Sequence, residues 1–143
     1  MYEYYWDGEN WLKTALVFGI RIYHLNNMRH RKDGPAFINY INKNFISLEE
    51  YRYYDFLHRE NGPALSWYYE DGSISMKEYY LNGKRHRKDG PAAVIYHIDG
   101  LIKDEEYWFN DIKFDPDDLS FELPIDTEEK QFLFNLKYGE NND

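Results

Sequence analysis

The feature that most constrains the fold is a 28-residue repeat. The seven residues "HRKDGPA" occur at positions 30–36 and again at 86–92, and a near copy, "HRENGPA", lies between them at 58–64. Tyrosines recur with the same spacing, and no gap is needed anywhere in the register: Tyr23, Tyr51, Tyr79 and Tyr107. Such a period is typical of an array of small units, each of which buries its apolar surface against its neighbours.

Each unit is predicted to contain two β-strands and two turns. In the third unit, residues 73–81 are rich in β-branched and aromatic residues, and Asn82-Gly83 is a strong hairpin signal because both positions tolerate positive φ. Residues 92–98 are expected to form the second strand, and Asp99-Gly100 turns the chain into the next unit. The polar segment 84–91 contains Gly-Pro, so it is expected to be a wide connection or corner rather than a central strand.

The first strand of each unit raises a question of register. The columns of Ile74 and Tyr79 are an odd number of residues apart, so in an unbroken strand they face opposite sides of the sheet. Two explanations are open. Either a β-bulge lies near the column of Glu50, Glu78 and Glu106, or both faces are partly covered.

The predicted fold is mainly β, an elongated, meandering antiparallel sheet of 28-residue hairpin repeats that is closed by one C-terminal α-helix. Asp7-Gly8 is expected to form an N-terminal hairpin that starts the sheet. A helix at about 127–138 would place Phe132, Leu133 and Leu136 over the last strands. We treat residues 1–143 as a single repeat domain with these parts: 1–16 as the N-terminal hairpin, 17–44, 45–72 and 73–100 as repeats, 101–123 as a degenerate fourth repeat, and 124–143 as a helical cap.

Composition limits the cellular setting and the chemistry. The chain has no cysteine, which excludes disulfides and thiolate metal sites. The N-terminal residues lack the features of a signal peptide, and no apolar run reaches the roughly 20 residues that span a bilayer. We therefore expect a soluble protein without membrane partners, located in the cytoplasm (of the host cell, if the protein is viral).

Charge is distributed unevenly along the chain. Residues 1–103 hold 14 Lys and Arg against 13 Asp and Glu, whereas residues 104–143 hold 3 against 13. A dense acidic surface can imitate a phosphate track and steer binding towards a basic groove; the alternative is a solubilising end cap. The candidate partner-binding residues of this acidic end are Asp104, Glu105, Glu106, Asp111, Asp115, Asp117, Asp118 and Glu122.

The segment "YYLNGKRHRKDGPAAVIYHIDG" (79–100) resembles the Asp-Gly-Pro-Ala repeats of bacteriophage and large DNA virus proteins, which are themselves similar to MORN (membrane occupation and recognition nexus) repeats. The resemblance covers roughly residues 17–120. It implies a ribbon of β-hairpins that acts as a scaffold or binding platform. The unit differs from MORN in its length and its Gly-Pro-Ala corner, so lipid binding is not carried over. A viral origin would imply interference with a host protein.

The heptapeptide carries histidine, arginine and a carboxylate, which raises the question of catalysis or metal binding. An enzyme has one site, but this motif has three equal copies, and no serine or cysteine nucleophile recurs with them. Adjacent units are about 9–10 Å apart, too far for neighbouring histidines to share a zinc ion with bonds of about 2 Å. The acidic run "DPDD" at 115–118 lacks the spacing of a calcium loop. We expect no catalytic residues, cofactor or metal.

A structural corner explains the motif better. Glycine would supply an unusual backbone angle, and the following proline would end strand pairing. Asp33, Asn61 and Asp89 are expected to bond their own backbone two residues on, closing an Asx turn. The arginine is expected to pair with an acid in a neighbouring unit, and the histidine to donate to a carbonyl.

The same corners could also form a basic ridge along one edge of the array. Such a ridge would meet phosphates or an acidic protein face, or it would only be a solvated edge that discourages sheet-to-sheet pairing. Its residues are His30, Arg31, Lys32, His58, Arg59, Arg85, His86, Arg87 and Lys88.

The sequence therefore favours a non-enzymatic protein–protein interaction module. In its concrete form this is a phage-like accessory protein that binds and blocks a host factor, such as a nucleic-acid-binding defence enzyme, through its acidic C-terminal end. The alternative is a nucleic-acid or polyanion binder that uses the basic ridge. Carbohydrate binding by exposed tyrosine and tryptophan side chains is a third hypothesis. The oligomeric state and the exposed face of the sheet stay open.

Overall fold

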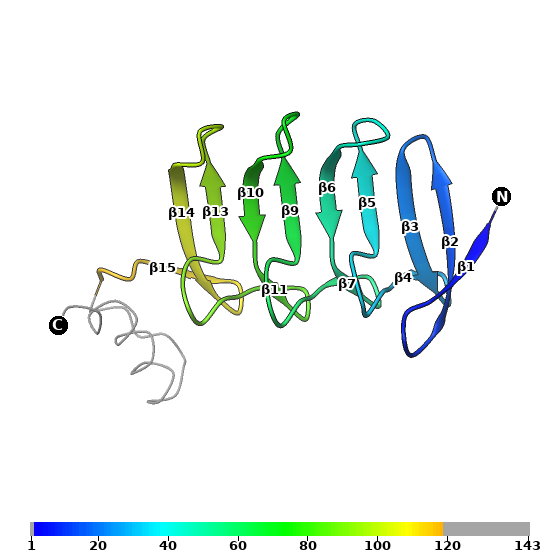
Figure 1. The fold of residues 1–143 in the computed structure, drawn as a ribbon. Coiled ribbons are helices and arrows are strands. Elements are labelled where there is room, and N and C mark those ends of the chain that lie inside the picture. The colour runs from blue at the N-terminus through cyan, green and yellow to red at the C-terminus, as the bar shows by residue number, and fades with distance from the viewer. Residues whose placement is uncertain (1, 119–143) are drawn as a thin grey trace.

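The computed structural model describes residues 2–118, which form one long antiparallel sheet (Figure 1). The main strands lie side by side in chain order, so the sheet is a meander, as the sequence predicted. Their bounds, in spatial order, are β1 (Glu3–Trp6), β2 (Trp11–Val17), β3 (Ile20–Leu25), β5 (Phe37–Tyr40), β6 (Ile46–Glu50), β9 (Leu65–Tyr68), β10 (Ile74–Glu78), β13 (Ala93–Tyr96), β14 (Ile102–Phe109) and β15 (Ile112–Phe114).

Short strands build a second set of hairpins along one end of the main strands, the lower end in Figure 1. β4 (Met28–Arg29) folds back on β3, β7 (Arg52–Tyr53) pairs with β8 (Phe56–Leu57), and β11 (Tyr80–Leu81) pairs with β12 (Lys84–Arg85). Both central residues of each turn have φ between 49° and 79°. This is the type I′ geometry that matches the twist of a tight hairpin. It confirms the turn predicted at Asn82-Gly83 and recurs at the positions that the 28-residue period relates to it: Asn26-Asn27, Tyr54-Asp55 and Asn110-Asp111.

The heptapeptides contain no strand residues. Each connects a short hairpin to the next main strand, for example β8 to β9 and β12 to β13. The prediction of a wide connection at 84–91 is therefore confirmed for the Gly-Pro part, whereas Lys84 and Arg85 belong to β12.

β-Bulges are present in β6, β10 and β14, but not near the column of Glu50, Glu78 and Glu106, which was one of the two explanations left open. Residue pairing shifts between Ile74 and Met76, so that Ser75 has no partner in β9. Equivalent shifts occur opposite β5 and β13. The bulge thus lies beside the turn between main strands rather than near Glu78. Because the extra residue changes the alternation, Ile74 and Tyr79 face the same side of the sheet.

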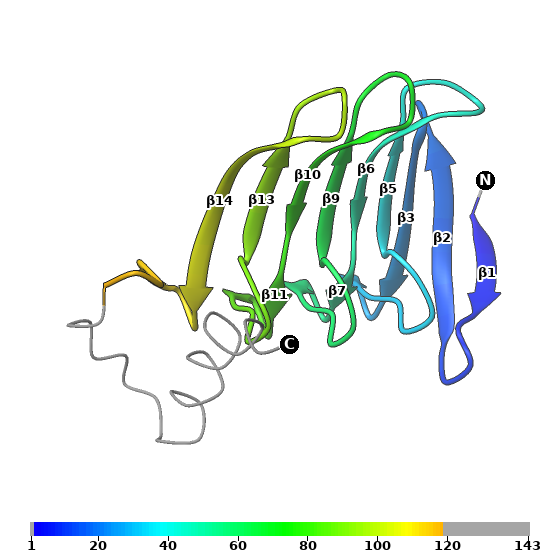
Figure 2. The same cartoon turned by 60° about the vertical axis from the view of Figure 1, so that its left-hand side comes forward.

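The two faces of the sheet differ in character. We call the side that bears Tyr23, Tyr51 and Tyr79 the tyrosine face, and the opposite side, which bears Leu48 and Trp67, the ladder face. Most of the buried residues lie on the tyrosine face, and most of them are small or apolar. They are Leu12, Thr14, Tyr23, Ala36, Ile38, Ala64, Ser66, Ala92 and Val94. The described strands form a single layer (Figures 1 and 2).

The N-terminal hairpin predicted at Asp7-Gly8 is formed by β1 and β2. The Asp7 side chain shapes its turn, because Oδ1 accepts hydrogen bonds from the N–H groups of Glu9 (3.0 Å) and Asn10 (2.7 Å). The predicted helix at about 127–138 lies outside the described residues. Over residues 2–118 the structure has no helix long and apolar enough to cross a membrane.

Candidate interaction surfaces

In every repeat unit the corner arginine lies on the ring of the tyrosine eight residues before it. Such contacts between a guanidinium and an aromatic face are attractive because the ring carries negative charge on its face. The distances from the guanidinium carbon to the ring centre are 4.3 Å for Arg31 and Tyr23, 3.8 Å for Arg59 and Tyr51, and 4.0 Å for Arg87 and Tyr79.

The glycine of the motif lies against the same guanidinium. A Cβ atom at Gly34, Gly62 or Gly90 would lie 2.8, 3.1 or 3.3 Å from the guanidinium carbon of its arginine. The expected unusual backbone angle is present at Gly62 (φ 128°) and Gly90 (φ 152°), whereas at Gly34 the close contact alone excludes a side chain. Glycine recurs because the arginine occupies the space of its side chain.

The polar partners of these arginines correct two predictions. Arg31 and Arg87 donate from Nε to Asp33 and Asp89 in the same unit, both at 2.7 Å, not to an acid in a neighbouring unit. The predicted Asx turns at Asp33, Asn61 and Asp89 were also wrong, because the residue two positions on is proline, which has no N–H to donate. Arg59 and Arg87 donate further to the carbonyl oxygens of Pro63 and Pro91, at 3.2 Å.

The histidines join each unit to the next. Nδ1 of His30 accepts the backbone N–H of Tyr54 (3.3 Å), and His58 and His86 accept those of Asn82 (3.0 Å) and Asn110 (3.3 Å). The expectation that the ring donates to a carbonyl was therefore wrong: the ring nitrogen Nδ1 is an acceptor, which requires it to be unprotonated. His30 is fully buried, and burial is the main cause of its lowered pKa.

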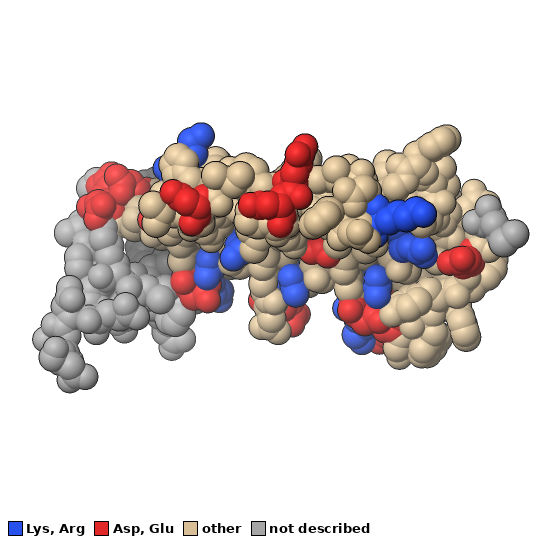
Figure 3. All heavy atoms as spheres, turned by 45° about the horizontal axis from the view of Figure 1, so that its top comes forward, with Lys and Arg blue, Asp and Glu red and all other residues tan. Residues whose placement is uncertain are grey.

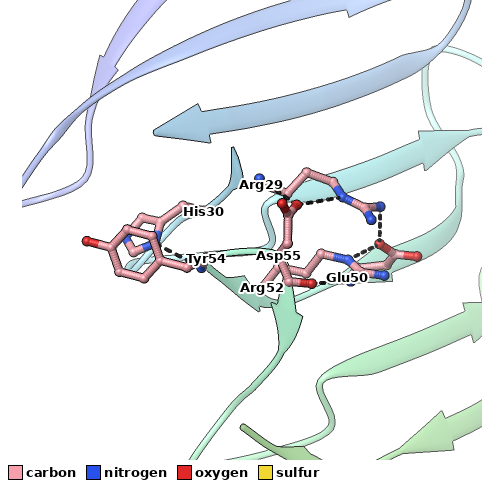
Figure 4. A network of polar contacts seen from close by, with 6 residues as sticks. All are labelled: Arg29, His30, Glu50, Arg52, Tyr54 and Asp55. Atoms are coloured by element: carbon pink, nitrogen blue, oxygen red, sulfur yellow. Dashed lines mark hydrogen bonds and ion pairs between the residues drawn. The ribbon is translucent and has the colours of Figure 1, made fainter. Parts of the chain in front are cut away.

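A second network lies beside His30 (Figure 4). Glu50 Oε2 accepts from Arg52 Nε (2.6 Å) and Arg29 (3.2 Å), while Asp55 Oδ1 accepts the backbone N–H of Arg29 (2.8 Å). Arginine and carboxylate thus hold the short hairpin against the main strand by charge-assisted hydrogen bonds.

Two residues of the predicted acidic end occupy these same structural positions in the last unit. Glu106 accepts from Lys113 (2.6 Å) and Trp108 (3.0 Å), and these bonds lower its pKa. Asp111 Oδ1 accepts the backbone N–H of Arg85 (2.7 Å), as Asp55 does from Arg29. Both carboxylates therefore support the fold.

The other acidic-end residues are at the β14–β15 end of the sheet, where acidic side chains are visible in Figure 3. Asp104, Glu105, Asp115, Asp117 and Asp118 are exposed. Asp115 Oδ1 accepts the N–H of Asp117 (2.8 Å), and Glu105 accepts the hydroxyl of Tyr107 (3.2 Å). Glu122 lies outside the described residues.

Most residues of the predicted basic ridge are buried, half-buried or paired within the corners. His30 and His86 are buried, and His58 and Arg59 are half-buried. The side chains of Arg31 and Arg87 are only 14% and 23% exposed, and Arg85 forms an ion pair with Glu78. Of the nine residues, Lys32 and Lys88 are exposed, and Lys32 pairs with Glu9 at 3.0 Å.

One surface was missed by the sequence reasoning. Four aromatic side chains of the β1–β2 hairpin are between 48% and 70% exposed: Tyr2, Tyr4, Trp6 and Trp11. The last three lie on the ladder face by their strand register, and the Lys13 ammonium lies 3.7 Å from the centre of the Tyr2 ring. Aromatic residues at alternate positions on both sides of Asp7-Gly8 are the signal that pointed to it.

The described part of the chain contains no group of three or more His, Asp or Glu side chains arranged to hold a metal ion. The recurring polar side chains instead have structural partners in the same or the next unit. Comparisons with protein-family models, with curated proteins and with solved structures found no match.

Proposed function

We propose that this chain is a non-enzymatic binding module that contacts a protein partner. The residue types that suggested chemistry, histidine, arginine and aspartate of the corners, are used in contacts that repeat from unit to unit. A side chain that is buried and bonded in this way stabilises the array rather than reacting with a substrate.

The acidic end is the surface we propose for the partner. Residues 101–118 contain seven Asp and Glu and only two Lys. The observation that carries the proposal is the exposure of Asp104 and Glu105 on β14, at the end of the sheet. A concentrated negative field at one end of an elongated molecule accelerates association with a basic surface and orients it.

A basic nucleic-acid-binding groove is the partner surface that such a field fits best. Together with the resemblance to phage and viral repeats, this supports a phage-like accessory protein that occupies the groove of a host defence enzyme. The alternative, a polyanion binder that uses the corners, has less support because only Lys32 and Lys88 of the ridge are exposed.

Charge reversal tests the proposal. The variant Asp104→Lys with Glu105→Lys is compared with Glu60→Lys with Glu70→Lys, which changes net charge equally at exposed positions elsewhere. Immobilised full-length chain is used to capture proteins from nuclease-treated bacterial lysate, followed by mass spectrometry. We expect the first variant to lose the captured protein and the control to retain it. Equal capture by both variants would exclude the acidic end as the contact surface.

A further inference from the structure

A continuous row of side chains crosses the ladder face. Its members are consecutive Cα partners from β2 to β14, so they point to the same side of the sheet. Six of the eight are apolar. We call this row the apolar ladder: Val17, Ile20, Asn39, Leu48, Trp67, Met76, Ile95 and Asp104.

The apolar ladder is accessible at its centre and at one end. Trp67 keeps 43% of its surface exposed and Val17 keeps 52%, whereas Leu48 is buried between its neighbours. The next row towards the corners contains Phe37 and Leu65 together with Glu50 and Glu78. Both of these carboxylates are bonded to arginine, so this row carries little free negative charge.

The two ends of the ladder face carry opposite charges. At the β2 end the charge on this face comes from Lys13. At the β14 end it comes from Asp104, because Glu106 is already paired with Lys113. When two copies face each other with their strand order reversed, the positive end of each face lies over the negative end of the other.

We propose that two copies of this chain pack through their ladder faces about a two-fold axis that runs parallel to the strands between β6 and β9. In this arrangement Leu48 of one copy faces Trp67 of the other, and Ile20 faces Ile95. The β2 end of each copy lies over the β14 end of the other, so Val17 faces Asp104, and the Lys13 row lies two residues beyond the row of Glu106. The interface is isologous, as in most homodimers.

The dimensions of the sheet suit this packing. The axes of the antiparallel strands from β2 to β14 stay nearly aligned across the array, with little accumulated twist (Figure 1). Contact can therefore extend over the whole face. Eight strands, each about 4.8 Å wide and about 17 Å long, give roughly 650 Å² per copy. The sum for two copies, about 1,300 Å², falls in the range of stable specific interfaces.

This inference is independent of the proposed function. The dimer leaves Glu105 on the opposite face, together with the corners, open to a partner protein. Because Asp104 belongs to both surfaces, Glu105→Lys alone tests lysate capture by the acidic end, and Trp67→Glu tests self-association through the ladder face. The two ideas therefore fail separately.

Sedimentation equilibrium and light scattering of the full chain test the dimer. We expect the wild-type chain to be dimeric and Trp67→Glu to be monomeric, because a carboxylate at the centre of an apolar interface loses its hydration. Ile98→Glu, at a 64%-exposed position in the β13–β14 turn, is the control that stays dimeric. Circular dichroism checks the fold of each variant, and Met76→Glu replaces Trp67→Glu if that variant does not fold.

An introduced charge pair gives a second, more specific readout. Val17→Lys, which faces Asp104 of the other copy, is expected to strengthen the dimer at low salt at least about fivefold, and Asp104→Lys in the same chain is expected to remove this gain. A wild-type monomer at concentrations up to about 100 μM would overturn the proposal, as would a Trp67→Glu variant that stays dimeric. A wild-type monomer whose Trp67→Glu variant loses a captured lysate protein would assign the face to a different partner and also overturn it.

Discussion

The guanidinium carbon of Arg59 lies 3.8 Å from the centre of the Tyr51 ring, eight residues earlier in the chain. The same guanidinium also lies close to Gly62, where an added Cβ atom would be 3.1 Å from the guanidinium carbon. The contact recurs in all three corners and forms a row of stacked side chains along the tyrosine face. Such side-chain ladders are one of the ways in which a flat sheet of many strands is stabilised.

Gly34 provides a test of why glycine is needed. Its φ lies outside the left-handed region, so Gly34→Ala is expected to destabilise the fold through contact with Arg31 alone, by about 1–3 kcal/mol. In an Arg31→Ala background the same substitution is expected to cost much less. Urea unfolding of the four chains of this double-mutant cycle measures the difference. An equal cost in both backgrounds would contradict the role given to the guanidinium.

Arg87 tests the geometry of the stack. Arg87→Lys keeps the charge but loses the planar group that contacts Tyr79 and bonds Asp89 and the Pro91 carbonyl. We expect a loss of about 1–2 kcal/mol of unfolding free energy. Lys84→Arg, at an exposed position of β12, is the control and is expected to be neutral. Thermal and urea unfolding provide the measurement.

Stability is expected to fall on acidification through neutral pH. Burial lowers the pKa of His30 below 6.5, so the unfolded chain binds a proton more readily than the folded one. The contribution of His30 is therefore complete above about pH 6.5 and is lost as pH falls through the lower folded pKa. His24, whose pKa burial also lowers, acts in the same direction.

The His30→Asn variant isolates this effect, since the amide oxygen can still accept from the N–H of Tyr54 but does not titrate. We expect its unfolding free energy to depend less on pH between about 7 and 5 than that of the wild type. His97→Asn, at an exposed position, serves as the control. Identical pH profiles for His30→Asn and wild type would show that His30 does not contribute.

Tyr68 is expected to titrate late in alkali. Its hydroxyl donates to Glu49 Oε2 at 2.7 Å, and burial together with this carboxylate raises its pKa to about 12. A raised tyrosine pKa stabilises the fold below the unfolded value near 10, and this contribution is lost as pH rises towards 12. Ultraviolet titration should show a late phenol that disappears in Tyr68→Phe. The absence of a late phenol would contradict this.

The sequence was sufficient for the fold of the described residues but not for the contacts of the corners. The hairpin signal at Asn82-Gly83 was confirmed, and the 28-residue period places the same turn at Tyr54-Asp55, where the letters alone are a weak signal. In contrast, the bond from Tyr54 to His30 joins residues 24 positions apart, and only the three-dimensional stacking of units brings them together. The proline after Gly34 was available in the sequence and already argued against an Asx turn at Asp33.

The acidic end shows the same limit. Net charge is a property of composition, whereas the role of each carboxylate depends on its neighbours. Glu106 continues the column of Glu50 and Glu78, so the repeat itself contained a sign that it was structural. Asp111 could be assigned only once the N–H of Arg85 was located beside it.

The bond from each corner histidine to the following unit has a consequence for how this chain can change in length. Every such bond spans 24 residues and reaches the next unit and no further. Removing or duplicating one whole 28-residue segment would therefore leave the remaining bonds intact and move the two ends by about 9.6 Å, the width of two strands. The separation of the ends is thus graded in fixed steps, as in a ruler, and gene duplication can adjust it without redesigning any single contact.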